Sequence, residues 1–218
     1  EISSQTAKMW KKASMMARSK PSPLNGFDLF NYMALIVCAR ARDYAEITFH
    51  KFADELEAKD AAGQYAFGAP ENEKHRVTWE GIAVWTYLGA TFKGLKNQGA
   101  VMTGSAYPGL WSLVYTPGDL ESMAEAYTNV YINTCGPNRY EEFYKVVKNS
   151  KSDGIVLHLN RSCKLMGLLN NEGAEYVNAK LGVPYVSFDG DQTDPRVFTP
   201  AQYETRVQAL TEMMDENQ

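Results

Sequence analysis

Four short strand-like segments alternate with helical patterns from about residue 75 onward, and this alternation limits the fold more than any other feature. Strands are predicted at residues 76–81, 100–105, 154–159 and 185–190. Repeated strand–helix alternation is typical of a parallel sheet that helices cover on both faces. Because crossovers between parallel strands are right-handed, we expect a four-stranded α/β sandwich of the flavodoxin or Rossmann type.

The helix after the last predicted strand has the clearest start signal in the chain. Thr199 is the expected N-cap, Pro200 occupies the first helical position, and Gln202 completes a capping box. The same kind of periodicity places helices between the strands, at residues 84–99, around 120–127, around 140–147 and at 172–182.

The first part of the chain has a different pattern, helical without strands. We expect a helical leader over residues 1–74, followed by the α/β domain over residues 75–218. Ser3 or Ser4 is a suitable cap for a first helix. A second, longer helical stretch is expected to begin at Phe27 and to pack against something larger than itself, because part of it is apolar all round.

Charge and cysteine usage exclude several functions. A net charge of −4 and an isoelectric point near 5.5 argue against nucleic acid as the main partner. The sequence has no apolar run long enough for a membrane span and no visible secretory signal. The three cysteines, Cys38, Cys135 and Cys163, are widely spaced without a CxxC pair. A reducing, cytoplasmic location is therefore expected rather than a disulfide framework.

Ligands of open parallel sheets bind beyond the carboxyl ends of the strands, so the loops at those ends are the candidate site. The first two strands lead to aromatic and hydroxyl side chains, and the fourth leads into the polar segment 189–196. The resulting candidates for a substrate-binding rim are Trp85, Ser105, Tyr107, Asp189, Asp191 and Arg196.

The loop after the third strand contains the sharpest candidate, Cys163. Arg161 and Lys164 flank it and favour the thiolate, which is the form that binds metals or attacks electrophiles. The start of the following helix adds to that effect. The same position also suits a small thiol buried beneath a loop. Cys38 lies within an apolar helix and is expected to pack in the protein core. Cys135 is expected to lie in a turn as an incidental loop thiol.

Other candidate residues give weaker evidence for a functional site. Asp189 and Asp191 are a possible pair of ligands for a hard cation, but capping of loops and pairing with Arg196 is the preferred explanation. His158, at a strand end, is expected to be a packing residue. No GxGxxG, P-loop or HExxH motif is present, so nicotinamide, P-loop nucleotide and zinc-protease functions have no support.

Three segments resemble the 2-hydroxyacyl-CoA dehydratase family. They are residues 79–115, 153–167 with the string NRSCK, and 183–214 with FDGDQTDPR; the two strings are specific in combination. The resemblance is to the C-terminal half of an alpha subunit, with the 2-hydroxyglutaryl-CoA enzyme as the nearest match. It is good over about residues 75–218 and loose over the helical leader. It therefore implies that an N-terminal half is missing and that this fragment alone is inactive.

The resemblance implies a [4Fe-4S] cluster held by three cysteines, with Cys163 as one ligand. The other two ligands belong to the N-terminal half, and Cys38 and Cys135 fall outside the family's ligand motifs. Arg161 and Lys164 would offset the charge of the cluster, and Asn160 and Ser162 would hydrogen-bond near the sulfur. Flavin in the full complex is left open.

The implied reaction is a lyase reaction of anaerobic amino-acid fermentation. Water leaves an (R)-2-hydroxyacyl-CoA through a ketyl radical to give the 2-enoyl-CoA, for example 2-hydroxyglutaryl-CoA to glutaconyl-CoA. The implied partners are a beta subunit in a heterodimer, an ATP-dependent iron–sulfur activator and the acyl-CoA substrate. The resemblance does not identify the base that removes the β-proton.

Two alternatives remain beside the dehydratase. The second hypothesis is a cluster-free scaffold that docks a partner subunit through the apolar helix around residues 33–38. The chain is also consistent with a subunit of a benzoyl-CoA reductase-like enzyme acting on aromatic thioesters. Iron content separates the scaffold from the two enzymes, and turnover of hydroxyacyl-CoA against benzoyl-CoA separates the enzymes.

Overall fold

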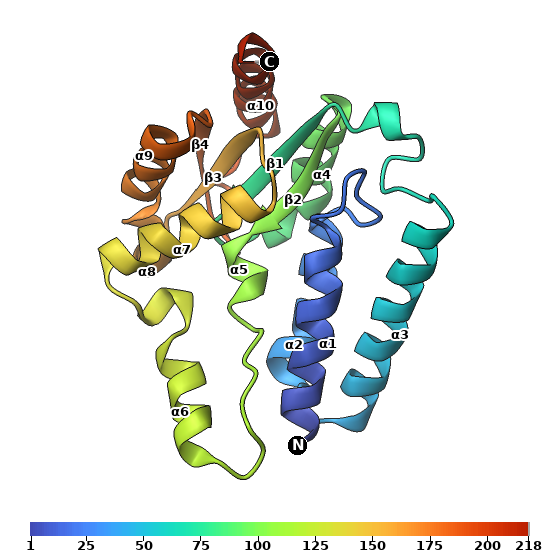
Figure 1. Cartoon of the computed structure of the whole chain (residues 1–218). Coiled ribbons are helices and arrows are strands. Elements are labelled where there is room, and N and C mark those ends of the chain that lie inside the picture. Colours follow the sequence, from blue (N-terminus) through green and yellow to red (C-terminus); the bar gives the residue numbers. More distant parts are fainter. Residues whose placement is uncertain (218) are drawn as a thin grey trace.

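The predicted strands form one parallel sheet. In the computed structural model, which describes residues 1–217, the four strands run in the order β2-β1-β3-β4 and every pairing is parallel. Their bounds are β1 His75–Glu80, β2 Ala100–Ser105, β3 Gly154–Asn160 and β4 Tyr185–Gly190. The α/β class predicted from the alternation of apolar segments is confirmed (Figure 1).

Helices cover both faces of the sheet, which is why β1, β2 and β3 are buried along nearly their whole length. On one face, α4 (Leu88–Asn97) and α10 (Pro200–Glu216) pack together and against the strands. On the other face, α7 (Gly136–Asn149) and α9 (Asn170–Leu181) enclose a second, smaller core. That core consists of Phe143, Val147, Ile155, Leu157, Ala174 and Val177.

The leader forms three helices, α1 (Ile2–Met16), α2 (Phe27–Cys38) and α3 (Asp43–Ala61). The long helical stretch expected from Phe27 is therefore interrupted between α2 and α3. The rings of Phe27 and Phe30 lie 5.2 and 6.3 Å from the ring of Trp79 in β1. Leader and sheet consequently share one apolar core, and Figure 1 shows α1, α2 and α3 side by side at one end of the sheet.

Several local predictions differ from the structure. Glu1 precedes α1 without a side-chain capping bond, while Ser4 donates its hydroxyl to the carbonyl of Tyr115 at 2.6 Å. Thr199 does precede α10, but its side chain makes no capping bond. Cys38 is exposed rather than buried, because it is the last residue of α2 and lies where the helix leaves the core.

Short helical turns complete the connections between the larger elements. The predicted helix 84–99 begins with a 3-10 turn, and α6 has no buried residue. The short elements are η1 Pro70–Asn72, η2 Trp85–Tyr87, α5 Ala106–Gly109, α6 Leu120–Thr128, η3 Tyr131–Asn133 and α8 Lys164–Gly167. Among residues 1–217, none of the helices has the length and apolar character needed to cross a bilayer.

Candidate functional site

The order in which strands join the sheet switches sides between β1 and β3: β2 lies on one side of β1, and β3 and β4 lie on the other. The connection from β1 passes through α4 to β2, and the connection from β2 passes through α7, on the other face, to β3. The loops after β1 and β3 therefore diverge, and such a switch point is where open α/β sheets bind ligands. Cys163 lies on the loop after β3, at this point.

The loop that carries Cys163 is held by buried polar side chains. Asn160, at the end of β3, is only 3 % exposed. Its Oδ1 accepts hydrogen bonds from the backbone N–H of Gln192 at 3.1 Å and from the hydroxyl of Ser162 at 3.3 Å. These contacts join the loops after β3 and β4. Asn160 and Ser162, which were expected to hydrogen-bond near the sulfur of Cys163, therefore hold the backbone of these loops in place.

Asp191 caps the same pair of loops. Its carboxylate accepts backbone hydrogen bonds from Ser162 at 2.9 Å, Thr193 at 2.9 Å and Asp194 at 3.0 Å. The N–H groups of Thr193 and Asp194 are the main reason that the pKa of Asp191 lies well below its ordinary value. The loop-capping interpretation of this residue therefore agrees with the structure.

The other charged rim candidates pair differently from the prediction. Arg196 binds Asp194, with Nη2 and Oδ2 2.7 Å apart, so the expected pairing of Arg196 with Asp189 and Asp191 is wrong. Asp189 instead lies 3.5 Å from Arg161, and both side chains are 61 % exposed. Such an exposed pair contributes little stability. Lys164 is also exposed.

Cys163 is partly exposed and precedes α8 as its N-cap residue. Because α8 contains only four residues, its dipole adds little to the local field. Tyr107 of α5 lies close by: burial raises the pKa of its hydroxyl, and the charge of Cys163 raises it further. A thiol from the β3 side thus lies near enough to a phenol from the β2 side for its charge to act on that phenol.

The remaining rim candidates separate into two hollows. Trp85 is 37 % exposed and packs edge-on against Phe30. With Tyr107 it lines a mainly apolar hollow of about 450 Å³ that also reaches Cys38. Ser105 lines a different cavity, on the side of α7. The structure therefore does not gather the six rim candidates into one pocket.

The sequence analysis did not single out a buried polar cluster beneath the Cys163 loop. Glu80, the last residue of β1, is fully buried, and its Oε1 accepts a hydrogen bond from the Tyr131 hydroxyl at 2.8 Å. Arg139 of α7 lies with Nη2 3.9 Å from the same oxygen. Burial raises the pKa of Glu80 to about 7, against the lowering effect of Arg139.

Arg139 connects this cluster to the cysteine loop. Its guanidinium is 2 % exposed, donates to the carbonyl of Leu165 at 2.6 Å and to Oδ1 of Asn170 at 3.2 Å, and stacks over the ring of Tyr131. Since Leu165 follows Cys163 by two positions, Arg139 fastens α8 to α7. The sequence could have indicated that Arg139 is buried, because Arg139 shares a helix face with Phe143 and Val147.

Replacing Glu80 with glutamine is expected to change how stability depends on pH. The folded-state pKa, about 7, lies above the unfolded value near 4.5, so the folded protein binds the extra proton between these values. Glu80 therefore stabilises the fold fully below about pH 4.5, and this contribution, up to about 3 kcal/mol, is lost as pH rises to about 7. Urea unfolding of both proteins between pH 5 and 8 measures the difference.

The wild type must be compared with the Glu80→Gln variant because buried His158 changes the free energy of unfolding with pH in the opposite direction. Its Nδ1 donates to the carbonyl of Ile82 at 2.5 Å, and burial lowers its pKa. Its contribution therefore rises with pH. Equal pH slopes in wild type and variant would contradict the assignment to Glu80.

The described residues do not fit a complete metal cluster. Within residues 1–217, no group of three or more histidine, cysteine or acidic side chains is placed to hold a metal ion. Cys38 and Cys135 are exposed and lie on other elements, at the end of α2 and before α7. Cys163 is therefore a single thiol donor, short of the usual three or four of an iron–sulfur cluster.

The fold and the loop define an α/β protein of the ligand-binding type, with one thiol at its switch point. The family model described as 2-hydroxyglutaryl-CoA dehydratase, D-component, matches residues 1–214. The chain belongs to this family.

Named relatives in this family are similar along nearly the whole chain. The lactoyl-CoA dehydratase subunit alpha of Anaerotignum propionicum is 59 % identical over 100 % of this chain and 52 % of its own length. The (R)-2-hydroxyglutaryl-CoA dehydratase subunit alpha of Acidaminococcus fermentans is 39 % identical over 98 % and 44 %. A benzoyl-CoA reductase subunit of Thauera aromatica is 23 % identical over 92 % and 49 %. The chain thus spans about half the length of these relatives.

Proposed function

We propose that this chain is part of an alpha subunit of an (R)-2-hydroxyacyl-CoA dehydratase and that it presents Cys163 to a [4Fe-4S] cluster. The family match over residues 1–214 is the observation that carries the proposal. The position of Cys163 on the switch-point loop, tied to the β4 loop and to Arg139, supports its role as a ligand. Two further cysteines would come from polypeptide outside these residues.

The reaction proposed is the elimination of water. The bond from C2 to the hydroxyl oxygen breaks, a proton leaves C3, and the products are the 2-enoyl-CoA and water. The C3 proton is weakly acidic, so an electron donated to the thioester by an ATP-driven iron–sulfur activator is needed, and that electron is recovered at the end. A beta subunit completes the assembly, as the designation of the relatives as alpha subunits suggests.

Lactoyl-CoA is the first substrate to test. The relative named for lactoyl-CoA is 59 % identical, whereas the relative named for 2-hydroxyglutaryl-CoA is 39 % identical. A lactoyl group is also small and uncharged. Loss of water from it gives acryloyl-CoA.

The test uses the complete alpha subunit with its beta subunit and activator, assembled without oxygen. Lactoyl-CoA, 2-hydroxyglutaryl-CoA and benzoyl-CoA are supplied separately, and the products are followed by mass spectrometry. We expect acryloyl-CoA from lactoyl-CoA at the highest rate. Reduction of benzoyl-CoA with no elimination from either hydroxyacyl-CoA would reject a dehydratase in favour of a reductase.

A cluster-free docking function is the second candidate, and one observation favours it. Val37 and Trp85 are each 37 % exposed beside the apolar hollow of about 450 Å³, in the region of α2 expected to dock a partner. Under this hypothesis the hollow receives the companion subunit. A complete complex that assembles through this surface but contains no iron would support the docking function alone.

A further inference from the structure

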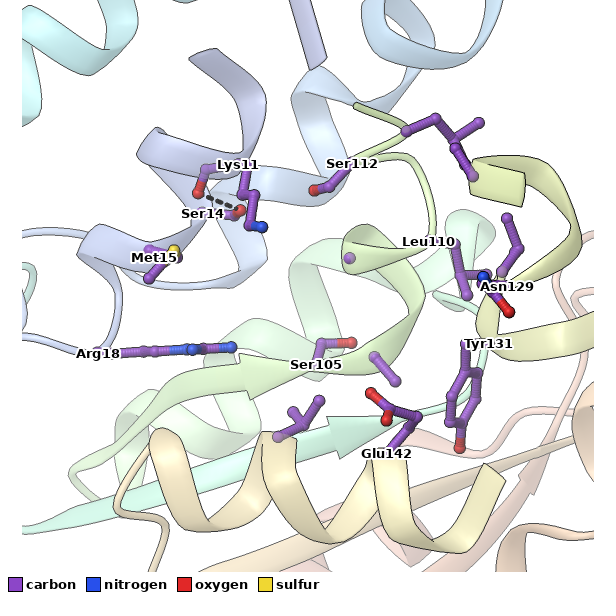
Figure 2. Close-up of a pocket in the computed structure, with 16 residues that line it drawn as sticks. Lys11, Ser14, Met15, Arg18, Ser105, Leu110, Ser112, Asn129, Tyr131 and Glu142 are labelled. Atoms are coloured by element: carbon purple, nitrogen blue, oxygen red, sulfur yellow. Dashed lines mark hydrogen bonds between the residues drawn. The ribbon is translucent and has the colours of Figure 1, made fainter. Parts of the chain in front are cut away.

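A second cavity, of about 500 Å³, lies between the leader and the face of the sheet that α7 covers. Its walls come from α1, the α5 segment, the end of α6 and α7, as Figure 2 shows. None of its lining residues belongs to the loop 160–164. The cavity therefore excludes the cysteine loop itself, although Tyr131 belongs both to its wall and to the buried cluster around Glu80.

Two cations of the leader face this cavity without a counter-ion. Lys11 and Arg18 line it, and in Figure 2 the Arg18 side chain extends in the direction of Ser105. Within residues 1–217, neither cation has a carboxylate within 4.0 Å. By contrast Lys12, on the same helix, pairs with Glu57 at 2.7 Å.

Arg18 is also partly desolvated. Burial lowers the pKa of its guanidinium, and its side chain makes no hydrogen bond within the described chain. Withdrawing a cation from water costs free energy unless an anion compensates it. A bound anion at this position would supply the missing partner.

Ser105 adds an unpaired donor to the same cavity. Its Oγ is buried and has no hydrogen-bonding partner in the part of the chain described. Buried hydroxyl groups are nearly always paired, so an unpaired one in a cavity wall is available to bond an atom that enters the cavity. A planar guanidinium, an ammonium and a hydroxyl form a donor set suited to phosphate oxygens.

The rest of the wall limits what the ligand can be. Glu142 lines the cavity, but its carboxylate pairs with Lys145 at 2.6 Å and so does not neutralise Arg18. The apolar lining residues include Met15, Leu110, Leu113, Val130 and Val146. A ligand that fits has an anionic head and an apolar arm.

We propose that this cavity binds the phosphate group of a phosphate ester, with Arg18, Lys11 and Ser105 as its donors. The inference goes beyond the dehydratase proposal and is independent of iron. Free inorganic phosphates and the phosphates of coenzyme A share this chemistry, so the experiment must separate them.

Calorimetric titration of the purified protein with pyrophosphate, coenzyme A and pantetheine tests the proposal. Pantetheine, which lacks phosphate, is expected not to bind. Arg18→Ala should weaken binding of the phosphate compounds by about 10- to 100-fold, the usual value of a charge-assisted hydrogen bond. Arg18→Lys should recover part of the loss. Lys12→Ala removes the same charge from the same region and should change nothing.

The outcomes divide clearly. Tighter binding of coenzyme A than of pyrophosphate identifies the ester as the ligand, and equal binding identifies a free-anion site; both support the proposal. Glu142→Gln should increase the affinity for either phosphate compound, because it removes a negative charge from the cavity wall. Absence of binding by both phosphate compounds, or equal affinity in wild type and Arg18→Ala, would overturn it. Failure here would leave the dehydratase assignment untouched, because that assay measures elimination rather than phosphate binding.

Discussion

The Cys163→Ala variant is expected to lose most of the iron and sulfide of the assembled enzyme and to lower its dehydratase activity by more than about 100-fold. Mutations that only disturb the surroundings of metal ligands already cost about 10- to 100-fold, so removal of a ligand should cost more. Iron and sulfide analysis of anaerobically purified complex measures the first effect. Elimination from lactoyl-CoA measures the second.

Two other cysteines provide matched controls for this experiment. Cys38 and Cys135 are exposed thiols on other elements, and their alanine variants should keep both iron and activity. Cys163 is only partly buried, so its alanine variant should unfold at nearly the wild-type temperature. Full iron content in Cys163→Ala would remove the ligand assignment while leaving the family membership intact.

The Arg139→Met variant is expected to lower the free energy of unfolding by about 3–5 kcal/mol, the usual cost of removing one partner of a buried charged pair. The change leaves Glu80 with its hydrogen bond from Tyr131 but without its buried counter-charge, and it leaves the carbonyl of Leu165 and Oδ1 of Asn170 without the donor that Arg139 supplies. Urea denaturation at pH 8, above the pKa of Glu80, measures the loss. Arg196→Met, which breaks an exposed pair, should cost less than about 1 kcal/mol.

A second readout separates positioning of the loop from general stability. Adding Glu80→Gln to Arg139→Met should recover part of the stability, because no unpaired buried carboxylate then remains. Arg139→Met should also lower the iron content of the assembled enzyme, because Leu165 loses the hydrogen bond that holds the Cys163 loop to α7. Glu80→Gln should not reverse this loss, since it does not replace that bond. A loss of less than about 1 kcal/mol of unfolding free energy in Arg139→Met would show that the fold does not depend on the buried polar cluster around Arg139.

The architecture could be predicted because it depends on local patterns. Each strand is a short segment that alternates with a helical pattern, and repeated alternation of this kind favours a parallel sheet covered on two faces. The predicted bounds of β2 and β4 agree with the structure, whereas β1 is shifted by one residue at both ends and β3 is one residue longer at its carboxyl end. The same reasoning placed Cys163 at the carboxyl end of β3, since strand ends follow directly from strand positions.

Pairings between distant residues could not be predicted in this way. Tyr131 and Glu80 are 51 positions apart, and only the packing of η3 against the end of β1 brings them together. Cys38 follows an apolar pattern, yet it is exposed because the helix ends at that residue. Periodicity defines the face of a helix, but it does not define what covers that face.

The sequence by itself determined the succession of strands and helices along the chain, the loop that carries Cys163 and the family membership. Each of these is encoded in contiguous residues. Only the tertiary structure decided which side chains share a buried site. The cluster around Arg139 and the cavity beside Arg18 arise where helices from different parts of the chain meet the sheet. Their energies depend on desolvation, and desolvation is a property of the packed molecule rather than of any segment.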